Sequence, residues 1–270
     1  MRRCADLSPR AEASRYARRV VVESFNGPWT MLVLLLAAGA VAAHYLLRHR
    51  SFRVKRAWLL GLAFVTLGSS IVFHVAFLLD PPAEGWPVFH NLPLHLCSIM
   101  SWVMPLVVWF DWKPLRAVAF YPGAIAGIAT LVSARPAEQG HPLLDPRSFF
   151  WVAHELNAIV PFLLVSLALY RPTARQVLES VAWVAAFALV VILPINLALR
   201  AWVDPGVNYF YLFSPEGADI LQVLWDLIPV PILYVTPILV LVLPVLYLQW
   251  GIYRVLTMRR DVAPSALATA

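Results

Sequence analysis

Long apolar stretches, broken by short polar segments, follow one another along almost the whole chain. Each is about 20 residues long, the length that an α-helix needs to cross the hydrocarbon core of a bilayer. The third and fourth stretches are the shortest, and only DWKP separates them. The stretches lie at roughly 29–47, 57–79, 93–110, 115–133, 149–170, 177–199 and 228–250. This pattern predicts an all-α fold, a polytopic membrane helical bundle of about seven transmembrane helices.

The stretches also divide the chain into regions. We expect a basic N-terminal tail over 1–28, a transmembrane domain over 29–250, and a C-terminal tail over 251–270 that is first basic and then disordered. Within the first tail, AEASRYARRVVVESF (11–25) has the composition of an amphipathic helix on the membrane surface. The first apolar stretch follows a leader too long for an ordinary signal peptide, so we expect it to be retained.

Composition supports a membrane protein and excludes a nucleic-acid binder. The 270 residues are 61% hydrophobic and only 13% charged, which is too much apolar surface for one soluble core of this size. The net charge of +6 comes largely from the tails and from RHRSFRVKR (48–56), where it would meet lipid headgroups. We therefore expect membrane lipids as partners and no nucleic acid; the oligomeric state stays open. Two cysteines, Cys4 and Cys97, are too few for a disulfide framework, although a bridge between them is compatible with the sequence.

Orientation follows from the basic residues that flank the helices. We call the membrane face that holds the N-terminus side A and the opposite face side B. Lys and Arg are more numerous next to the membrane on side B, for example in 48–56. The positive-inside rule then predicts an integral membrane protein with its N-terminus outside and its C-terminus in the cytoplasm.

Polar side chains within the stretches gather near side A. His74 lies about five residues before the end of the second stretch, about 8 Å deep at 1.5 Å per residue. His95 and Cys97 lie in the first turns of the third stretch, and His154 and Asn157 begin the fifth. Ionisable groups in membrane helices usually face a bundle interior or a wet cavity. The sequence therefore predicts a polar pocket near this face.

Helical phase decides which of these groups can act together. His95 and Cys97 are two positions apart, about 200° around a helix, so they do not share a face. If Cys97 is a nucleophile, its base must be His154, His74 or, from the preceding loop, His90. A metal site of His74, His95, His154 and Glu155 is an alternative, but the spacing H-x4-H-x-C matches no compact zinc pattern. We therefore predict no metal and no cofactor.

Four segments carry a resemblance to a known family. LPLHLCSI (92–99), the preceding His74, HELN (154–157) and NYFYL (208–212) resemble the YwaF-like integral membrane family over roughly residues 30–250. Its bacterial members are mostly of unknown function, and a eukaryotic member of the wider family is described as a phospholipid acyltransferase that works through an acyl-cysteine. We expect this chain in a bacterial plasma membrane. The resemblance implies that Cys97 accepts the acyl group, with His154, or else His74 or His95, as the base.

Two functional hypotheses follow. The first is a lipid acyltransferase or acyl hydrolase that uses an acyl-cysteine at Cys97. The second is a transporter or sensor without catalysis, which binds a proton, a metal or a small ligand at the histidines. In either case the residues expected to line the substrate site share a stripe with His95, accompany His154 or follow the sixth helix. They are Asn91, Ser98, Asn157, Asn208 and Tyr209.

Overall fold

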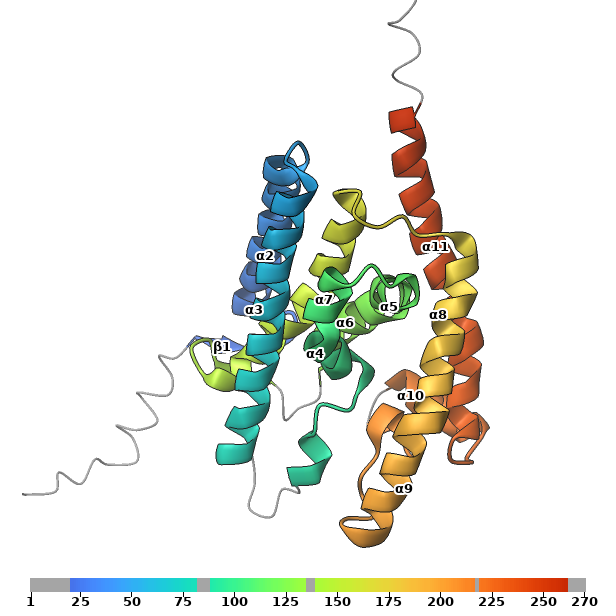
Figure 1. Cartoon of the computed structure of the whole chain (residues 1–270). Coiled ribbons are helices and arrows are strands. Elements are labelled where there is room, and N and C mark those ends of the chain that lie inside the picture. The colour runs from blue at the N-terminus through green and yellow to red at the C-terminus, as the bar shows by residue number, and fades with distance from the viewer. Residues whose placement is uncertain (1–19, 82–87, 135–138, 217–218, 262–270) are drawn as a thin grey trace, which may run out of the picture.

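The computed structural model describes residues 20–81, 88–134, 139–216 and 219–261. Its long helices run roughly along one direction, with α7 between two outer groups (Figure 1). One group is α2 (Gly27–Leu47) with α3 (Phe52–Leu79), and the other contains α8 (Ala174–Phe187) and α11 (Thr236–Asp261). The all-α prediction is confirmed. Cys4 and most of the predicted amphipathic tail lie outside the described residues.

Six helical segments of the described chain are long and apolar enough to cross a membrane. They span Gly27–Leu47, Phe52–Leu79, Lys113–Val132, Pro146–Ser166, Ala174–Trp202 and Leu233–Thr257. The third predicted stretch is a shorter apolar helix, α4 (Leu96–Trp109), of 14 residues. It begins later than expected because the backbone is still extended at His95, with φ −75° and ψ 152°.

Two of the spans are interrupted by π-helical turns. The first consists of α5 (Lys113–Val118), the π turn Ala119–Gly123 and α6 (Ala124–Val132). Pro122 lies inside that turn, where its missing N–H removes one helical hydrogen bond. The second consists of α8, the π turn Ala188–Ile192 and α9 (Leu193–Trp202). A π turn rotates the residues that follow it, so each span presents different faces above and below its turn.

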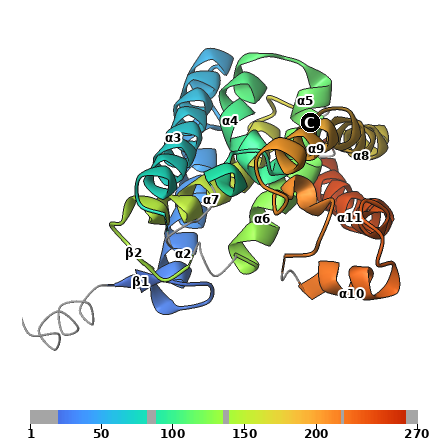
Figure 2. The same cartoon turned by 90° about the horizontal axis from the view of Figure 1, so that it is seen from below.

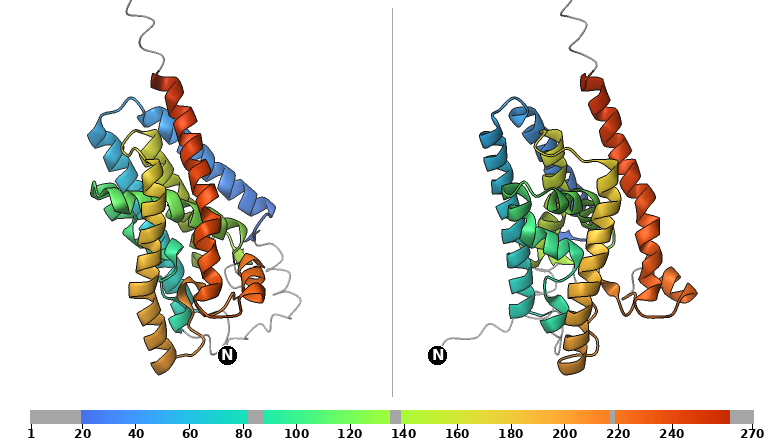
Figure 3. Two further views of the ribbon diagram at one scale, coloured as in Figure 1. Left: turned by 90° about the vertical axis from the view of Figure 1, so that its right-hand side faces the viewer. Right: turned by 45° about the vertical axis from the view of Figure 1, so that its right-hand side comes forward.

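The last apolar stretch begins later than its composition suggests. Residues 219–227 form a separate helix, α10, which lies crosswise to α11 (Figure 2). Pro229 and Pro231 separate it from the 3₁₀ turn Leu233–Val235 that leads into α11. The two side views in Figure 3 place α10 at the same end of the molecule as the C-terminal end of α9. α11 continues to Asp261, past the expected end of the transmembrane domain.

The core forms around α7 (Phe149–Ser166), which packs against α2, α3, α4 and α6. Its span is largely buried, whereas most of α2 and α11 is exposed. The largest apolar cluster joins α3, α4, α5, α7, α8 and α11 through residues such as Leu59, Met104 and Val160. α2, α8 and α11 therefore present most of their surface to lipid, while α4 and α7 are enclosed.

At side B, two arginines connect neighbouring helices by donating hydrogen bonds to backbone carbonyls. The Arg116 guanidinium is buried and donates hydrogen bonds to the carbonyls of Val107 at 3.2 Å and Leu169 at 3.1 Å. It also pairs with Asp111. Arg56 of α3 donates to the carbonyl of Trp109. These bonds satisfy carbonyls that the helix C-termini leave without an intrahelical partner, and they place the end of α4 beside the first turns of α3.

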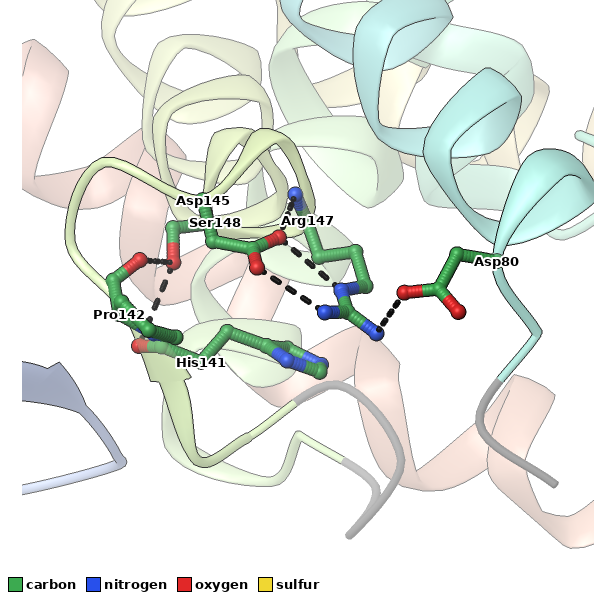
Figure 4. A network of polar contacts seen from close by, with 6 residues as sticks. All are labelled: Asp80, His141, Pro142, Asp145, Arg147 and Ser148. Atoms are coloured by element: carbon green, nitrogen blue, oxygen red, sulfur yellow. Dashed lines mark hydrogen bonds and ion pairs between the residues drawn. The ribbon is translucent and has the colours of Figure 1, made fainter. Parts of the chain in front are cut away.

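A second polar network lies at side A (Figure 4). Arg147, in the turn before α7, pairs with Asp145 at 2.9 Å and with Asp80, after α3, at 3.3 Å. The Ser148 hydroxyl donates to the carbonyl of Pro142 at 2.7 Å. Pro142 belongs to β2 (His141–Pro142), which pairs antiparallel with β1 (Val21–Val22). The network thus joins the N-terminal strand, the end of α3 and the start of α7. Hydrogen bonds from the Arg147 guanidinium hold the pKa of the Asp145 carboxyl below its ordinary value.

Candidate functional site

Cys97 is the second residue of α4 and is half-buried. Trp109, the last residue of this helix, contacts Arg56 at side B, so the depth of Cys97 can be counted from that end. Twelve residues separate the two positions, which corresponds to about 18 Å along the helix axis. In a hydrocarbon core about 30 Å thick, Cys97 therefore lies roughly 12 Å below side A. The thiol therefore lies within the hydrocarbon core, in the half of the bilayer next to side A.

Asn157 of α7 forms a hydrogen bond with the backbone of Cys97 itself. Its side-chain amide donates to the carbonyl of Cys97 at 2.8 Å and to the hydroxyl of Ser101 at 2.7 Å. The Ser101 hydroxyl itself donates to the same Cys97 carbonyl at 3.2 Å. Asn157 is fully buried. Its amide group therefore holds α4 against α7, and its predicted role in binding substrate stays a prediction.

His154 lies on α7 one turn before Asn157. Its Nδ1 is 2.7 Å from the carbonyl of Phe150, and its ring packs on the Phe150 ring with a centroid distance of 4.2 Å. A carbonyl can only accept, so Nδ1 carries the proton and the lone pair lies on Nε2. Because Asn157 binds the Cys97 backbone, the single turn between it and His154 brings this imidazole to the level of the thiol. The structure thus places Asn157 at the α4–α7 interface and the His154 ring beside Phe150 of the same helix.

His74 of α3 repeats the same arrangement. Its Nδ1 is 2.6 Å from the carbonyl of Ser70, which again places the lone pair on Nε2. The Ser70 hydroxyl accepts a hydrogen bond of 3.2 Å from the Trp102 indole and so links α3 to α4. Phe73, next to His74, packs on Phe150 at 5.2 Å. The two imidazoles thus belong to helices that pack directly on each other.

His95 has different surroundings. It is the residue before the first turn of α4, and its side chain makes no capping hydrogen bond. Its ring packs instead against Tyr209 and Tyr211, with centroid distances of 5.4 Å and 5.1 Å. The structure therefore places His95 toward the loop that follows α9, apart from the Phe73–Phe150 contact that joins the helices of His74 and His154.

The loop that contains NYFYL is held by two asparagines. Asn196 of α9 accepts from the backbone N–H of Tyr209 at 2.8 Å and donates to its carbonyl at 2.9 Å. Asn208 accepts from the N–H of Phe213 at 2.8 Å and donates to the carbonyl of Ser214 at 2.7 Å. The Tyr209 hydroxyl donates to the carbonyl of Phe89 and accepts from the N–H of Leu92. These bonds give Asn208 and Tyr209 a role in shaping the loop; contact with substrate stays a prediction for both.

Three further polar groups are buried at this end of the molecule. The Asn91 amide nitrogen and one carboxylate oxygen of Glu155 have no hydrogen-bond partner within the described parts of the chain. Ser98 is buried on α4. Asn91 and Ser98 were predicted to bind substrate, and nothing in the structure decides that role. Among the described residues, His, Cys, Asp and Glu form no group of three or more that could hold a metal ion.

Some of these contacts could have been found in the sequence and others could not. Ser70 and Phe150 each lie four residues, about one helical turn, before the histidine that contacts their carbonyl, so helical spacing alone could have suggested both partners. The role of Ser101, and of Asn196 far along the chain, depends on how separate segments rotate and pack. No local pattern carries that information.

Comparison with protein families identifies one family whose sequence pattern matches this chain. Residues 22–248 match the TMEM164 family, a range close to that of the YwaF-like resemblance. The resemblance is confirmed only at the level of an integral membrane protein family, and the matching family is TMEM164. No curated protein and no solved structure matches the chain. Since the match covers most of the 270 residues, the chain belongs to the TMEM164 family of integral membrane proteins.

Proposed function

We propose that this protein is a phospholipid acyltransferase that carries the acyl group on Cys97. The observation that supports it most is the Asn157 contact, which sets the thiol of α4 beside the helix that carries His154. A cysteine nucleophile needs a neighbouring base that takes its proton and a fixed geometry between the two. Two hydrogen bonds from one buried amide provide such a geometry here.

The chemistry divides into two transfers. In the first, the Cys97 thiol gives its proton to His154 Nε2, and the sulfur attacks the ester carbonyl carbon of a phospholipid. The ester C–O bond breaks, the leaving lysolipid oxygen takes the proton from His154, and a thioester remains. In the second, the hydroxyl of another lysolipid, or water, gives its proton to His154 and attacks the thioester. The C–S bond then breaks, and the thiolate takes the proton back from His154.

The start of α4 supports the charged species in both steps. The first N–H groups of a helix have no intrahelical acceptor and point outward along its axis. They carry a partial positive charge, which favours a thiolate and a developing oxyanion at the same place. Cys97 occupies the second helical position. The His95 side chain, at the N-cap, makes no capping hydrogen bond to the first N–H groups of α4.

The experiment is an acyl-exchange assay in liposomes with the full chain and with Cys97→Ser and Cys97→Ala. We expect loss of exchange in both variants, and loss of an acyl adduct on Cys97 that neutral hydroxylamine removes. Leu106→Ala, at an exposed position of the same helix, is the matched control and should keep the adduct. Undiminished exchange in Cys97→Ala contradicts the proposal.

Glu155 favours a second candidate, a proton-binding transporter or sensor. This buried carboxyl lies next to His154 on α7, and one of its oxygens has no partner in the described residues. Ionisable groups within membrane spans often mark proton pathways. This function predicts that substitutions of His74, His154 and Glu155 alter a pH-dependent uptake or response while Cys97→Ala has no effect. The Cys97 variants of the liposome assay therefore separate the two candidates.

A further inference from the structure

A groove of about 300 Å³ lies between α4, α5 and α8, at the lower end of the size range of ligand pockets. Every side chain that lines it is apolar, including Leu96 and Val103 of α4, Val118 of α5 and Val184 of α8. Charged or polar parts of a ligand have nothing to bind there. A hydrocarbon chain is the ligand that such a lining suits.

One end of the groove lies at the first turn of α4, the turn that carries Cys97. Leu96, at its upper end, directly precedes Cys97 on α4. Met100 also lines the groove and, three residues from Cys97, lies on the adjacent helix face. Met100 packs closely on Gly123, where any larger residue would crowd it, because a Cβ at Gly123 would lie only 3.0 Å from Met100 Cγ. The flexible thioether of Met100 therefore belongs to the part of the groove lining that is nearest in sequence to Cys97 on this helix side.

The groove ends toward side B. Trp112, which precedes α5, and Trp183 of α8 both line it, and their rings meet edge to face at a centroid distance of 6.5 Å. The α4 residues that line the groove extend from Leu96 to Val103, a rise of about 10 Å along the helix. The groove thus runs from the level of Cys97 away from the headgroups of side A, along the direction that a lipid tail takes in a bilayer.

We infer that this groove, defined by the lining of α4, α5 and α8, holds the acyl chain that Cys97 accepts and that the Trp112–Trp183 contact limits the length of that chain. The inference rests on the proposed function. The inference assigns the acyl-chain site to side chains of the groove that take no part in the chemistry. The same side chains would set which acyl-chain lengths the protein prefers.

The first arm of the test measures which chains Cys97 carries. Val103→Trp and Val184→Trp fill the groove, and Leu106→Trp adds the same bulk to α4 at an exposed position outside it. Intact-protein mass spectrometry then compares the acyl adducts formed from equal mixtures of long-chain and medium-chain phospholipids. We expect the ratio of long to medium chains to fall about tenfold in the two groove variants, which is about 1.4 kcal/mol of selectivity. Leu106→Trp should leave the ratio unchanged.

The second arm needs no catalysis. A phosphatidylcholine with a photoreactive group in its tail is crosslinked to Cys97→Ala in nanodiscs, and we expect labelled peptides from α4 and α8 that Val103→Trp removes. Acyl adducts whose chain-length ratio is the same in Val103→Trp as in Leu106→Trp overturn the groove inference and leave the proposed function intact. Groove labelling in a protein that never forms an acyl adduct overturns the proposed function and leaves the groove as a lipid site.

Discussion

The side-chain amide of Asn157 donates a hydrogen bond of 2.8 Å to the backbone carbonyl of Cys97, across 60 positions of the chain. The contact joins the first turn of α4 to α7 inside the bundle. It fixes the separation between the thiol and His154, because His154 lies one turn before Asn157 on the same helix. The distance between the proposed nucleophile and its base therefore depends on a residue that takes no part in proton transfer.

Asn157→Leu should weaken this junction. The change removes two hydrogen bonds and, of the side-chain donors described for the Cys97 carbonyl, leaves the Ser101 hydroxyl. Loss of a buried hydrogen-bond partner costs about 1–3 kcal/mol, so we expect a clearly lower melting temperature in detergent. Ser101→Ala, which keeps the bond from Asn157 to Cys97, should have a smaller effect. Equal melting temperatures for Asn157→Leu and the parent protein contradict this role.

His154→Gln should reduce acyl exchange far more than His95→Gln. Glutamine preserves much of the volume of histidine but cannot take a proton, and a general base contributes about 10²–10⁴ to the rate. His95 packs between Tyr209 and Tyr211 on the loop side, so its loss should leave most of the rate. His74→Gln completes the series, and initial rates of exchange between pH 5 and 9 are the measurement. If only His74→Gln removes the alkaline rise of the rate, then His74 is the base.

Glu155→Leu should stabilise the protein. One of its carboxylate oxygens is buried without a hydrogen-bond partner in the described chain, and such a group costs about 1–3 kcal/mol. Leucine has a similar size and no such penalty, so we expect a higher melting temperature. Glu179, which is partly exposed and paired with Arg175, is the control position and should show no gain on the same change. A lower melting temperature for Glu155→Leu indicates that the carboxyl binds a ligand or an ion.

Asp145 should make the stability of the side-A network depend on pH. The Arg147 hydrogen bonds place the folded-state pKa of Asp145 below its unfolded value, which is about 4. The contribution of this carboxylate is therefore fully present above about pH 4 and is lost as the pH falls through the folded pKa. We expect Asp145→Asn to melt earlier than the parent protein at pH 6, with a difference that shrinks toward pH 3.

Asp80→Asn is the control for this measurement. Asp80 pairs with the same Arg147, but its side chain is 77% exposed, so its ion pair is screened by solvent. The melting temperature should change little at any pH between 3 and 7. A difference for Asp145→Asn that stays constant over this range argues against a titrating carboxylate.

The sequence predicted the helices better than the contacts between them. Length and the absence of charge define a membrane helix, so the second and fifth stretches agree closely with α3 and α7. α4 is shorter than its apolar stretch because the backbone is still extended at His95. α10 was missed because it has only nine residues and lies before the last predicted stretch, which begins at 228. Breaks of this kind depend on backbone geometry, which hydropathy does not register.

The candidate site was predicted as a set of helices at one depth, and its internal geometry was not. Hydropathy and spacing placed Cys97, His74 and His154 near the same face. They could not show that Asn157 binds the backbone of Cys97, or that His95 turns toward Tyr209, because both depend on the rotation of each helix about its axis. The contact between Asn196 of α9 and Tyr209 was harder still to predict, since the two residues meet only after the chain reverses direction.

The shortness of α4 has a consequence for the membrane itself. Its first turn sets the thiol well inside one half of the bilayer, and the groove beside it extends away from the nearer surface. Lipids of that single leaflet can approach the bundle by sideways diffusion, whereas lipids of the opposite leaflet must first flip. Acyl remodelling at Cys97 would therefore change the fatty-acid composition of one leaflet only, and the protein would generate bilayer asymmetry as well as new lipid species.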